Sequence, residues 1–309
     1  MEFQRKNILS KYPWLQERNL PFIVSADYDG LICASFLHHH LGWELTGYYN
    51  LSSLWISKKA EINNDNLIWV DLNILSKRGR AIGGHIVSLN GELPRGFKSS
   101  CNPNIIANLN AEKFESKFPF STLIFLLWLN NIQIEKELLA RMLVLHSDAS
   151  WLKYQEYGEN VNQWINALEN YDWKWLFQKV NSITFENRVD EILYPELKKI
   201  GAVSGLSKLS SKKLNIKSRQ FQFNPDWDED IILNLFKLFG NKLKWTPPPL
   251  PIISHRIDGT RKKISLSKVK DIGLSKFLKN NNIFSYAIPS PRIFNYTSFG
   301  NSKLPLEPS

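Results

Sequence analysis

Two aspartates separated by a single residue, Asp27 and Asp29, directly follow a short apolar run in the stretch FIVSADYDGLICASFLHHH. Two carboxylates this close repel one another unless a cation or a proton lies between them. Divalent Mg²⁺ and Mn²⁺ prefer such hard oxygen ligands. The pair therefore predicts a metal site where a buried strand meets a turn.

Three further residues with ligand chemistry stand at the ends of predicted elements. Asp71 ends an apolar run in IWVDLN, Asp148 closes a helical stretch in LVLHSDAS, and His85 follows two glycines in IGGHIV. A lone aspartate after a strand is most often a helix cap or a turn residue. The prediction of a metal site therefore depends on the whole set and on the elements that gather it.

Residues 21–150 alternate between apolar, β-branched runs and stretches of helical length. Strands are predicted at residues 21–26, 43–50 and 66–74 and within residues 80–90, and helices at 31–41, 120–131 and 134–148. Strands that are apolar throughout and separated by helices are typical of a parallel sheet covered on both faces. The predicted fold class is α/β, with a doubly wound, mostly parallel sheet that binds ligands beyond the carboxyl ends of its strands.

The pattern changes along the chain and predicts three parts. Residues 1–150 form the metal-binding α/β domain, and residues 151–200 form a helical connector whose tryptophans are core anchors. Residues 201–309 form a separate C-terminal domain. This last part contains the Ser/Lys-rich stretch SGLSKLSSKKLNIKSRQ and the segment WTPPPLPII, whose prolines exclude a helix or a central strand.

The excess of positive charge lies in the C-terminal third. The chain has a net charge of +10, while residues 201–309 alone hold 18 basic and 7 acidic residues. A confined basic excess indicates a polyanionic partner, although a basic surface without a specific partner has the same composition. The predicted nucleic-acid contacts are Arg256, Arg261, Lys262, Lys263, Lys268 and Lys270. Nearby aromatic side chains either stack on unpaired bases or form a small core: Phe277, Phe284, Tyr286, Phe294 and Tyr296.

Several classes of protein find no support in the sequence. The only cysteines are Cys33 and Cys101, which give no disulfide framework or zinc site and favour a reducing cytoplasm. No run of 18 apolar residues and no signal peptide occurs, so we expect no membrane association. The three histidines at 38–40 project about 100° apart on a helix and cannot converge on one ion. Patterns of serine hydrolases and P-loop proteins are absent from the sequence.

The order of these motifs resembles the DHH phosphoesterase superfamily, and within it the RecJ-type exonucleases. SADYDGLICAS is similar to the first family motif, IWVDLNI to the second, GGHIVSLNGELPRGFKSSCNPN to the third, and ARMLVLHSDAS to the fourth. The resemblance covers about residues 20–150. It implies that Asp27, Asp29, Asp71 and Asp148 ligate one or two Mn²⁺ or Mg²⁺ ions. It further implies that His85 contacts metal or phosphate, and that Asp29 and His85 serve catalysis.

Two features depart from the family pattern. The third motif has Gly83-Gly84-His85 where the family has Asp-His-His, so only one of three chemical side chains remains. The glycine-rich motif of the usual C-terminal substrate domain is missing. An active site with a reduced metal set and an inactive site on a retained fold both remain open.

The resemblance implies a metal-dependent phosphodiesterase, in particular a single-strand exonuclease. One alternative is a catalytically inactive DHH-like scaffold that binds nucleic acid or a partner protein. A second alternative is a phosphodiesterase for short or cyclic oligonucleotides, against which the basic C-terminal third argues, because a small substrate needs no long positive track.

Overall fold

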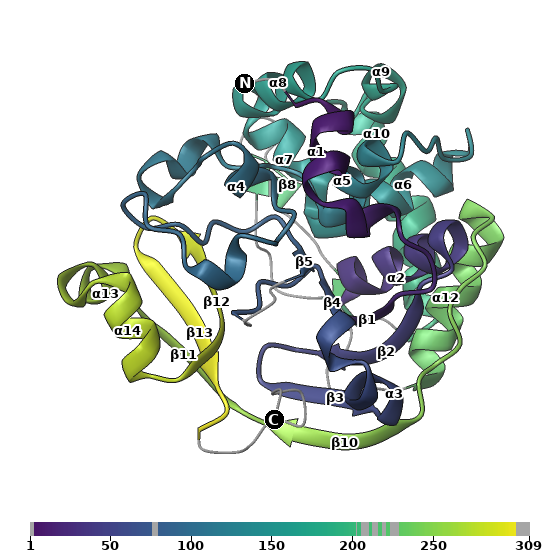
Figure 1. Cartoon of the computed structure of the whole chain (residues 1–309). Coiled ribbons are helices and arrows are strands. Elements are labelled where there is room, and N and C mark those ends of the chain that lie inside the picture. The colour runs from purple at the N-terminus through teal and green to yellow at the C-terminus, as the bar shows by residue number, and fades with distance from the viewer. Residues whose placement is uncertain are drawn as a thin grey trace. The chain divides into compact units, whose positions relative to one another are not determined.

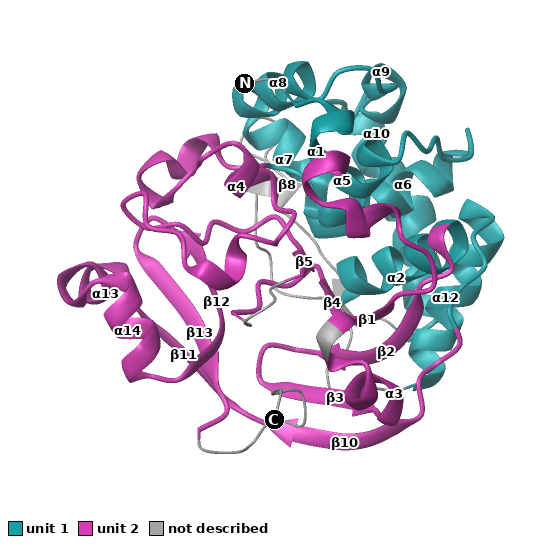
Figure 2. Cartoon of the chain, in the orientation of Figure 1, with its two compact units in different colours: residues 1–8, 27–40, 119–248 teal, residues 9–26, 41–118, 249–309 magenta. Residues whose placement is uncertain are grey.

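The computed structural model describes residues 3–75, 80–201, 203–204, 210–211, 216–217, 221–222 and 229–300. The chain forms two compact units that interleave in sequence (Figure 2). Unit 1 comprises residues 1–8, 27–40 and 119–248, and unit 2 comprises residues 9–26, 41–118 and 249–309. The boundaries predicted at residues 150 and 200 do not coincide with boundaries between these units.

Unit 2 contains a six-stranded, mostly parallel sheet in the order β10-β3-β2-β1-β4-β5 (Figure 1). Its strands are β1 (Pro21–Ser25), β2 (Glu44–Tyr49), β3 (Ser53–Ser57), β4 (Ile68–Val70), β5 (Ala81–Ile82) and β10 (Ile253–Asp258). β1 pairs in parallel with β2 and β4, and β4 pairs in parallel with β5. Every residue of β1, β3 and β4 is buried, which explains their continuous apolar sequences. The predicted α/β class and the four predicted strands are confirmed.

The antiparallel edge of this sheet comes from a distant part of the chain. β10 pairs with β3 from Ser57↔Ile253 to Ser53↔Asp258. The region after residue 200 was predicted as one separate domain, but the units divide it at residue 248. The reason is that β10 completes the main sheet instead of joining an independent fold. Much of the Ser/Lys-rich stretch lies outside the described residues.

A second sheet in unit 2 has the order β11-β13-β12, with β11 (Thr260–Ser265) at an edge. The other strands are β12 (Ile283–Ser290) and β13 (Ile293–Ser298), and the two helices are α13 (Leu266–Ile272) and α14 (Leu274–Asn280). Phe277 of α14 packs edge-on against Phe294 and Tyr296, and Tyr286 stacks on Phe294 at 4.9 Å. These aromatic side chains are therefore a small core, as the burial alternative predicted.

The remaining short elements of unit 2 lie between the strands of the main sheet or precede it. They are η1 (Pro13–Gln16), α3 (Lys58–Ile62), η2 (Asn64–Asn66), η3 (Arg95–Phe97), α4 (Pro103–Ile106) and η4 (Ala111–Ser116). The serine at 57 ends β3 and caps α3, because its hydroxyl accepts the amide hydrogen of Ala60.

Unit 1 is mostly helical. Its helices are α2 (Tyr28–Leu41), α5 (Thr122–Leu129), α6 (Leu138–His146), η5 (Ser147–Ala149), α7 (Ser150–Glu156), α8 (Gly158–Ala167), α9 (Trp173–Leu176), α10 (Ile183–Arg188), η6 (Val189–Leu193), α11 (Tyr194–Lys199) and α12 (Glu229–Leu243), and α1 (Arg5–Lys11) begins in it. Two short antiparallel pairs are described as well: β6 (Val203–Ser204) with β9 (Phe221–Gln222), and β7 (Ser210–Ser211) with β8 (Ile216–Lys217).

The core of unit 1 is built from apolar helices and from the tryptophans that were predicted to be buried. All eight residues of α5 are buried, so this helix has no polar face. Trp151, Trp164 and Trp173 are buried as predicted, and Trp173 stacks on Phe120 at 5.8 Å. Within the described residues, no helix combines the length and the apolar character that crossing a membrane requires.

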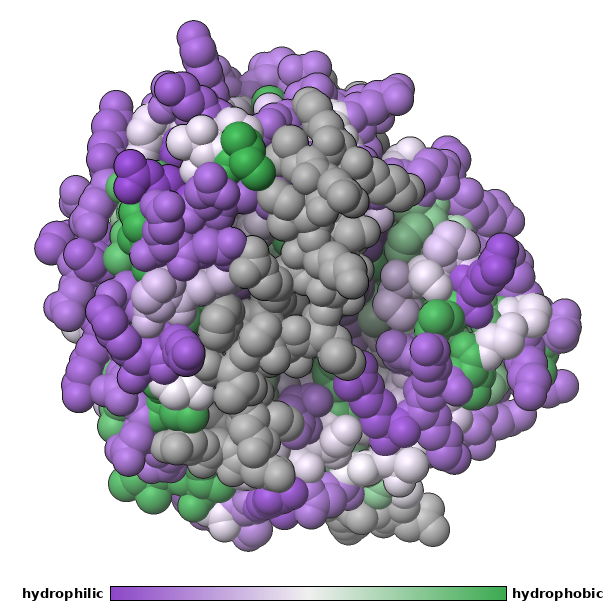
Figure 3. All heavy atoms as spheres, turned by 180° about the vertical axis from the view of Figure 1, so that it is seen from behind, coloured by the Kyte–Doolittle hydropathy of each residue, from purple (hydrophilic) through white to green (hydrophobic). Residues whose placement is uncertain are grey.

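The view in Figure 3 shows a described surface that is mainly hydrophilic, with small apolar groups between polar side chains. Few large apolar residues of the described chain are exposed, and Ile252 and Ile62 are the most exposed of them, at 90% and 72%. Apolar residues scattered in this way are normal for a folded surface and do not define a docking patch.

Gly47 lies in β2 at a position with no room for a side chain. A Cβ atom there would lie 2.3 Å from the carbonyl oxygen of Trp55 and 3.2 Å from a side-chain carbon of Ile23. We expect Gly47→Ala to lower the free energy of unfolding by about 2 kcal/mol or more, because the neighbouring strand must shift. Chemical denaturation measures this loss. The matched control is Gly158→Ala, where nothing lies within 4 Å, and equal stabilities for the two variants would contradict the prediction.

Candidate metal centre

Asp27 lies at the carboxyl end of β1, where the strand gives way to α2. Its Oδ1 atom accepts the amide hydrogen of Gly30 at 3.0 Å, and its carbonyl accepts that of Leu31. This is an N-terminal cap, which satisfies a helix amide that has no partner within the helix. The side chain remains exposed to solvent. Capping and metal binding are compatible, because a carboxylate has a second oxygen and further lone pairs.

Asp29 lies in the first turn of α2 and is buried, with 7% of its surface exposed. The positive end of the helix dipole favours a carboxylate at this position. Its Oδ1 atom also accepts the backbone amide hydrogen of Asp148. Burial and, to a smaller degree, the Asp29 carboxylate raise the pKa of the neighbouring Tyr28 well above its usual value. Tyr28 therefore stays neutral, and its hydroxyl donates to the carbonyl of Leu143 at 2.8 Å.

Asp71 follows β4, and the parallel register places it beside the end of β1. Val24 pairs with Val70, so each strand reaches the same edge of the sheet at this point. Ser25 donates its hydroxyl to Oδ2 of Asp71 at 2.8 Å and thereby fixes the carboxylate. The backbone of Asp71 is left-handed, with φ of 58°. Strained residues of this kind gather at functional sites, where the surrounding structure holds them.

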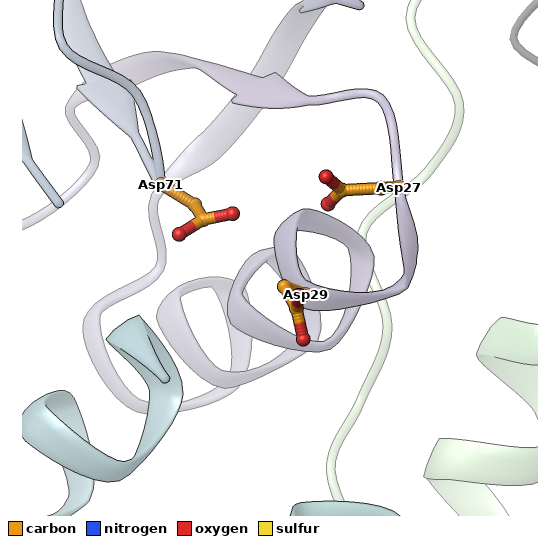
Figure 4. A group of neighbouring side chains, drawn as sticks. All are labelled: Asp27, Asp29 and Asp71. Atoms are coloured by element: carbon orange, nitrogen blue, oxygen red, sulfur yellow. The ribbon is translucent and has the colours of Figure 1, made fainter. Parts of the chain in front are cut away.

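These three aspartates form a compact group of carboxylates (Figure 4). Each offers one oxygen, and the three oxygens lie within 4.8 Å of one another. In octahedral coordination at about 2.1 Å, neighbouring ligand oxygens lie roughly 3 Å apart and opposite ones roughly 4.2 Å. Oxygens at this separation form a group that could hold one divalent ion. The donor set fits Mg²⁺ or Mn²⁺ and does not distinguish between them.

Asp148, the fourth predicted carboxylate, lies outside this group. It occupies η5, between α6 and α7, with φ of 48°, and the next residue, Ala149, has φ of 52°. Its amide hydrogen bonds Asp29, but its Oδ2 atom pairs with the ammonium of Lys153. The backbone amide of Asp148 therefore contacts Asp29, while its carboxylate forms an ion pair with Lys153.

His85 is exposed and also lies outside the group of three. Its backbone is held by two asparagines that sequence reasoning missed. Asn102 donates to the carbonyl of His85 at 2.8 Å, and Asn104 donates to the carbonyl of Gly84 at 2.7 Å. Both amides are 1% exposed. The signal was the sequence Asn-Pro-Asn, because a buried amide side chain must find partners for its donors.

Gly83 has little room for a side chain. A Cβ atom there would lie 3.0 Å from the carbonyl oxygen of Leu72 and 3.3 Å from Oδ1 of Asn73. We expect Gly83→Asp to lower the free energy of unfolding by about 1–3 kcal/mol and to leave Mn²⁺ affinity no higher. Thermal denaturation and Mn²⁺ titration measure the two effects, with Gly158→Asp as the control. A gain in Mn²⁺ affinity would show that the site accepts the side chain found in the family.

The other histidines belong to no metal-ligand group of the described residues. Four of them lie in helices of unit 1, and His255 lies on β10 of unit 2, where its ring pairs with Glu61. His39 accepts the amide hydrogen of Thr246 at 3.0 Å, and His40 packs against Phe36. His146 is 1% exposed and packs edge-on against Tyr28 at 4.9 Å. Burial lowers the pKa of His146 to about 4, so its ring is neutral at neutral pH.

The predicted nucleic-acid contacts lie on three consecutive elements of unit 2, and all are exposed. Arg256 on β10 donates to Asp258 at 3.0 Å and lies over the Trp55 ring, so its charge is partly engaged. Arg261, Lys262 and Lys263 lie on the edge strand β11, and Lys268 and Lys270 lie on α13. Basic residues on an edge strand also discourage pairing with other chains, which is a role that needs no nucleic acid.

Comparisons with protein families, with curated proteins and with solved structures found no match to this chain.

Proposed function

We propose that this protein is a metal-dependent phosphodiesterase that acts on nucleic acid, with a doubly wound, DHH-like fold and the activity of a RecJ-like single-strand exonuclease. The observation that carries the proposal is the group of three aspartate oxygens within 4.8 Å of one another, two of them from residues that follow neighbouring parallel strands. A divalent cation beside the scissile phosphate promotes phosphodiester hydrolysis, and this group is suited to hold one.

Each residue of the proposed site has its own role. Asp27, Asp29 and Asp71 bind the cation. The hydroxyl of Ser25 orients Asp71, and the start of α2 holds Asp27 and Asp29 in place. A bound divalent ion would supply a Lewis acid that activates water and stabilises the leaving oxygen. In this proposal His85, which is exposed, contacts the phosphate; Asn102 holds its backbone and Asn104 that of Gly84.

The exposed basic residues of β11 and α13 support a polyanionic substrate. Lysine and arginine contacts to phosphates are independent of sequence and sensitive to salt. Four of the five aromatic residues beside them are buried and Phe284 is partly buried, so base stacking is not their task in this proposal. Affinity therefore depends on charge, and the substrate is bound mainly through its backbone.

A second function, the non-catalytic scaffold, is favoured by one specific observation. A Cβ atom at Gly83 would lie 3.0 Å from the carbonyl oxygen of Leu72, which disfavours the side chain that the family has at this position. A scaffold of this kind would keep the fold and bind nucleic acid or a partner protein without cleaving it.

The deciding experiment is cleavage by the full chain. Single-stranded DNA and RNA labelled at the 5′ or the 3′ end, and a cyclic dinucleotide, are incubated with Mn²⁺ or Mg²⁺, with chelator as the control. We expect metal-dependent release of nucleotides from single strands. Release from the cyclic dinucleotide alone would favour the small-substrate alternative, and binding without any cleavage would favour the scaffold.

A further inference from the structure

The turn that carries Asp148 has an unusual backbone for its sequence. Asp148 and Ala149 are consecutive left-handed residues, at φ of 48° and 52°, between α6 and α7. Alanine has no side-chain hydrogen bond to favour this conformation, so the turn is held against its own preference. The result is that the Asp148 amide points to the Asp29 carboxylate, while the Asp148 side chain is directed elsewhere.

The Asp148 side chain meets Lys153, which lies on the following helix, α7. Its Oδ2 atom pairs with the Lys153 ammonium. The exposed fractions of the two side chains are 15% for Lys153 and 37% for Asp148, compared with 69% and 33% for the Lys199–Glu196 pair on α11. A less exposed ammonium is screened less by water and is more costly to leave without a counter-charge. Breaking the ion pair between Lys153 and Asp148 is therefore costly.

We propose that Lys153 is the permanent counter-cation of Asp148 and that the centre consequently takes one divalent ion, held by Asp27, Asp29 and Asp71. The inference rests on the proposed function and makes it more specific. Four carboxylates could balance two divalent ions, but here one of the four is already balanced by an ammonium. A second ion beside Asp148 would have to displace that ammonium or lie next to it, and like charges at that distance repel.

The same arrangement gives Asp29 two roles. Its Oδ1 atom accepts the Asp148 amide hydrogen, and in this scheme Asp29 also supplies one oxygen to the single ion. The Asp148 turn thus supports the metal group through its backbone, and Lys153 keeps the nearby carboxylate from becoming a ligand. Asp148 and Lys153 are positioning residues in this scheme.

The test counts bound Mn²⁺ by calorimetry and by the spectroscopic signal of free Mn²⁺, with no measurement of activity. We expect one ion per wild-type chain and none at comparable affinity in Asp71→Asn. Lys153→Met removes the ammonium, so we expect two ions per chain, and the added substitution Asp148→Asn should return the count to one. Lys199→Met removes a lysine from an exposed pair and should leave the count at one.

Each outcome bears on a different claim. Two ions in the wild type, or one ion in folded Lys153→Met, would overturn the role of Lys153 and leave the metal centre intact. A wild-type chain that binds no Mn²⁺ would remove the metal centre and the proposed function with it. Circular dichroism establishes that the variants fold, and Lys153→Gln replaces Lys153→Met if the latter does not.

Discussion

Asp29→Ala is expected to abolish Mn²⁺-dependent release of nucleotides from a labelled single strand. The substitution removes the most buried carboxylate of the metal group and the acceptor for the Asp148 amide. Loss of one electrostatic element from a catalytic site costs roughly 10²–10³-fold, and loss of the cation itself removes the catalyst. We therefore expect a fall of at least about 10³-fold, measured as initial rates over a range of Mn²⁺ concentrations.

The control for this experiment is Asp172→Ala. Asp172 also lies at a helix start, where its Oδ1 atom accepts the amide hydrogen of Trp175 at 3.2 Å. Its loss costs about 1 kcal/mol of stability and has no connection with the metal group. Rates that fall equally in both variants would indicate a general loss of folded protein. A rate that survives Asp29→Ala would remove this carboxylate from the mechanism.

Simultaneous reversal of Arg261, Lys262 and Lys263 to glutamate is expected to weaken binding of single-stranded nucleic acid by about 10²-fold or more at low salt. The three side chains are exposed on β11, and they pair with β13 through backbone hydrogen bonds that the substitutions leave in place. Each phosphate contact contributes a slope of about −0.7 in log K against log salt. The variant should therefore bind more weakly and with a shallower salt dependence, whatever the nucleotide sequence.

A matched variant separates local contact from overall charge. Lys174, Lys179 and Lys198 are exposed on unit 1, and their reversal to glutamate changes the net charge by the same amount. Fluorescence anisotropy over a salt series compares the two variants. Similar losses would assign binding to net charge alone, and unchanged affinity in the β11 variant would place the nucleic-acid surface elsewhere.

Local sequence patterns predicted the parallel part of the main sheet but not its antiparallel edge. Strands β1, β2, β4 and β5 have apolar runs with clear ends, whereas β3, which pairs antiparallel with β2, was not predicted. β10 has the sequence ISHRID, in which most residues are exposed, and its partner β3 lies about 200 residues earlier. A polar strand that pairs with a strand far away in the sequence has no apolar periodicity of its own, so it cannot be recognised from the residues around it.

The candidate site also has a part that the sequence predicted and a part that it did not. Asp27, Asp29 and Asp71 come together because carboxyl ends of neighbouring parallel strands meet at one edge, which the sequence pattern predicts. The orientation of the Asp148 side chain depends on two left-handed residues, and neither is the glycine or asparagine that signals such a backbone. His85 depends on Asn102 and Asn104, whose contacts follow from the tertiary fold.

The pairing of β10 with β3 has a consequence for synthesis of the chain on the ribosome. β3 is complete at Ser57, but its partner strand emerges only when residues 253–258 have been added. At about 5–20 residues per second, β3 waits roughly 10–40 s with its outer hydrogen-bonding groups unpaired. An unpaired edge of buried-type residues is the surface on which nascent chains aggregate. The last strand of the sheet to be synthesised is therefore the one that ends this exposure.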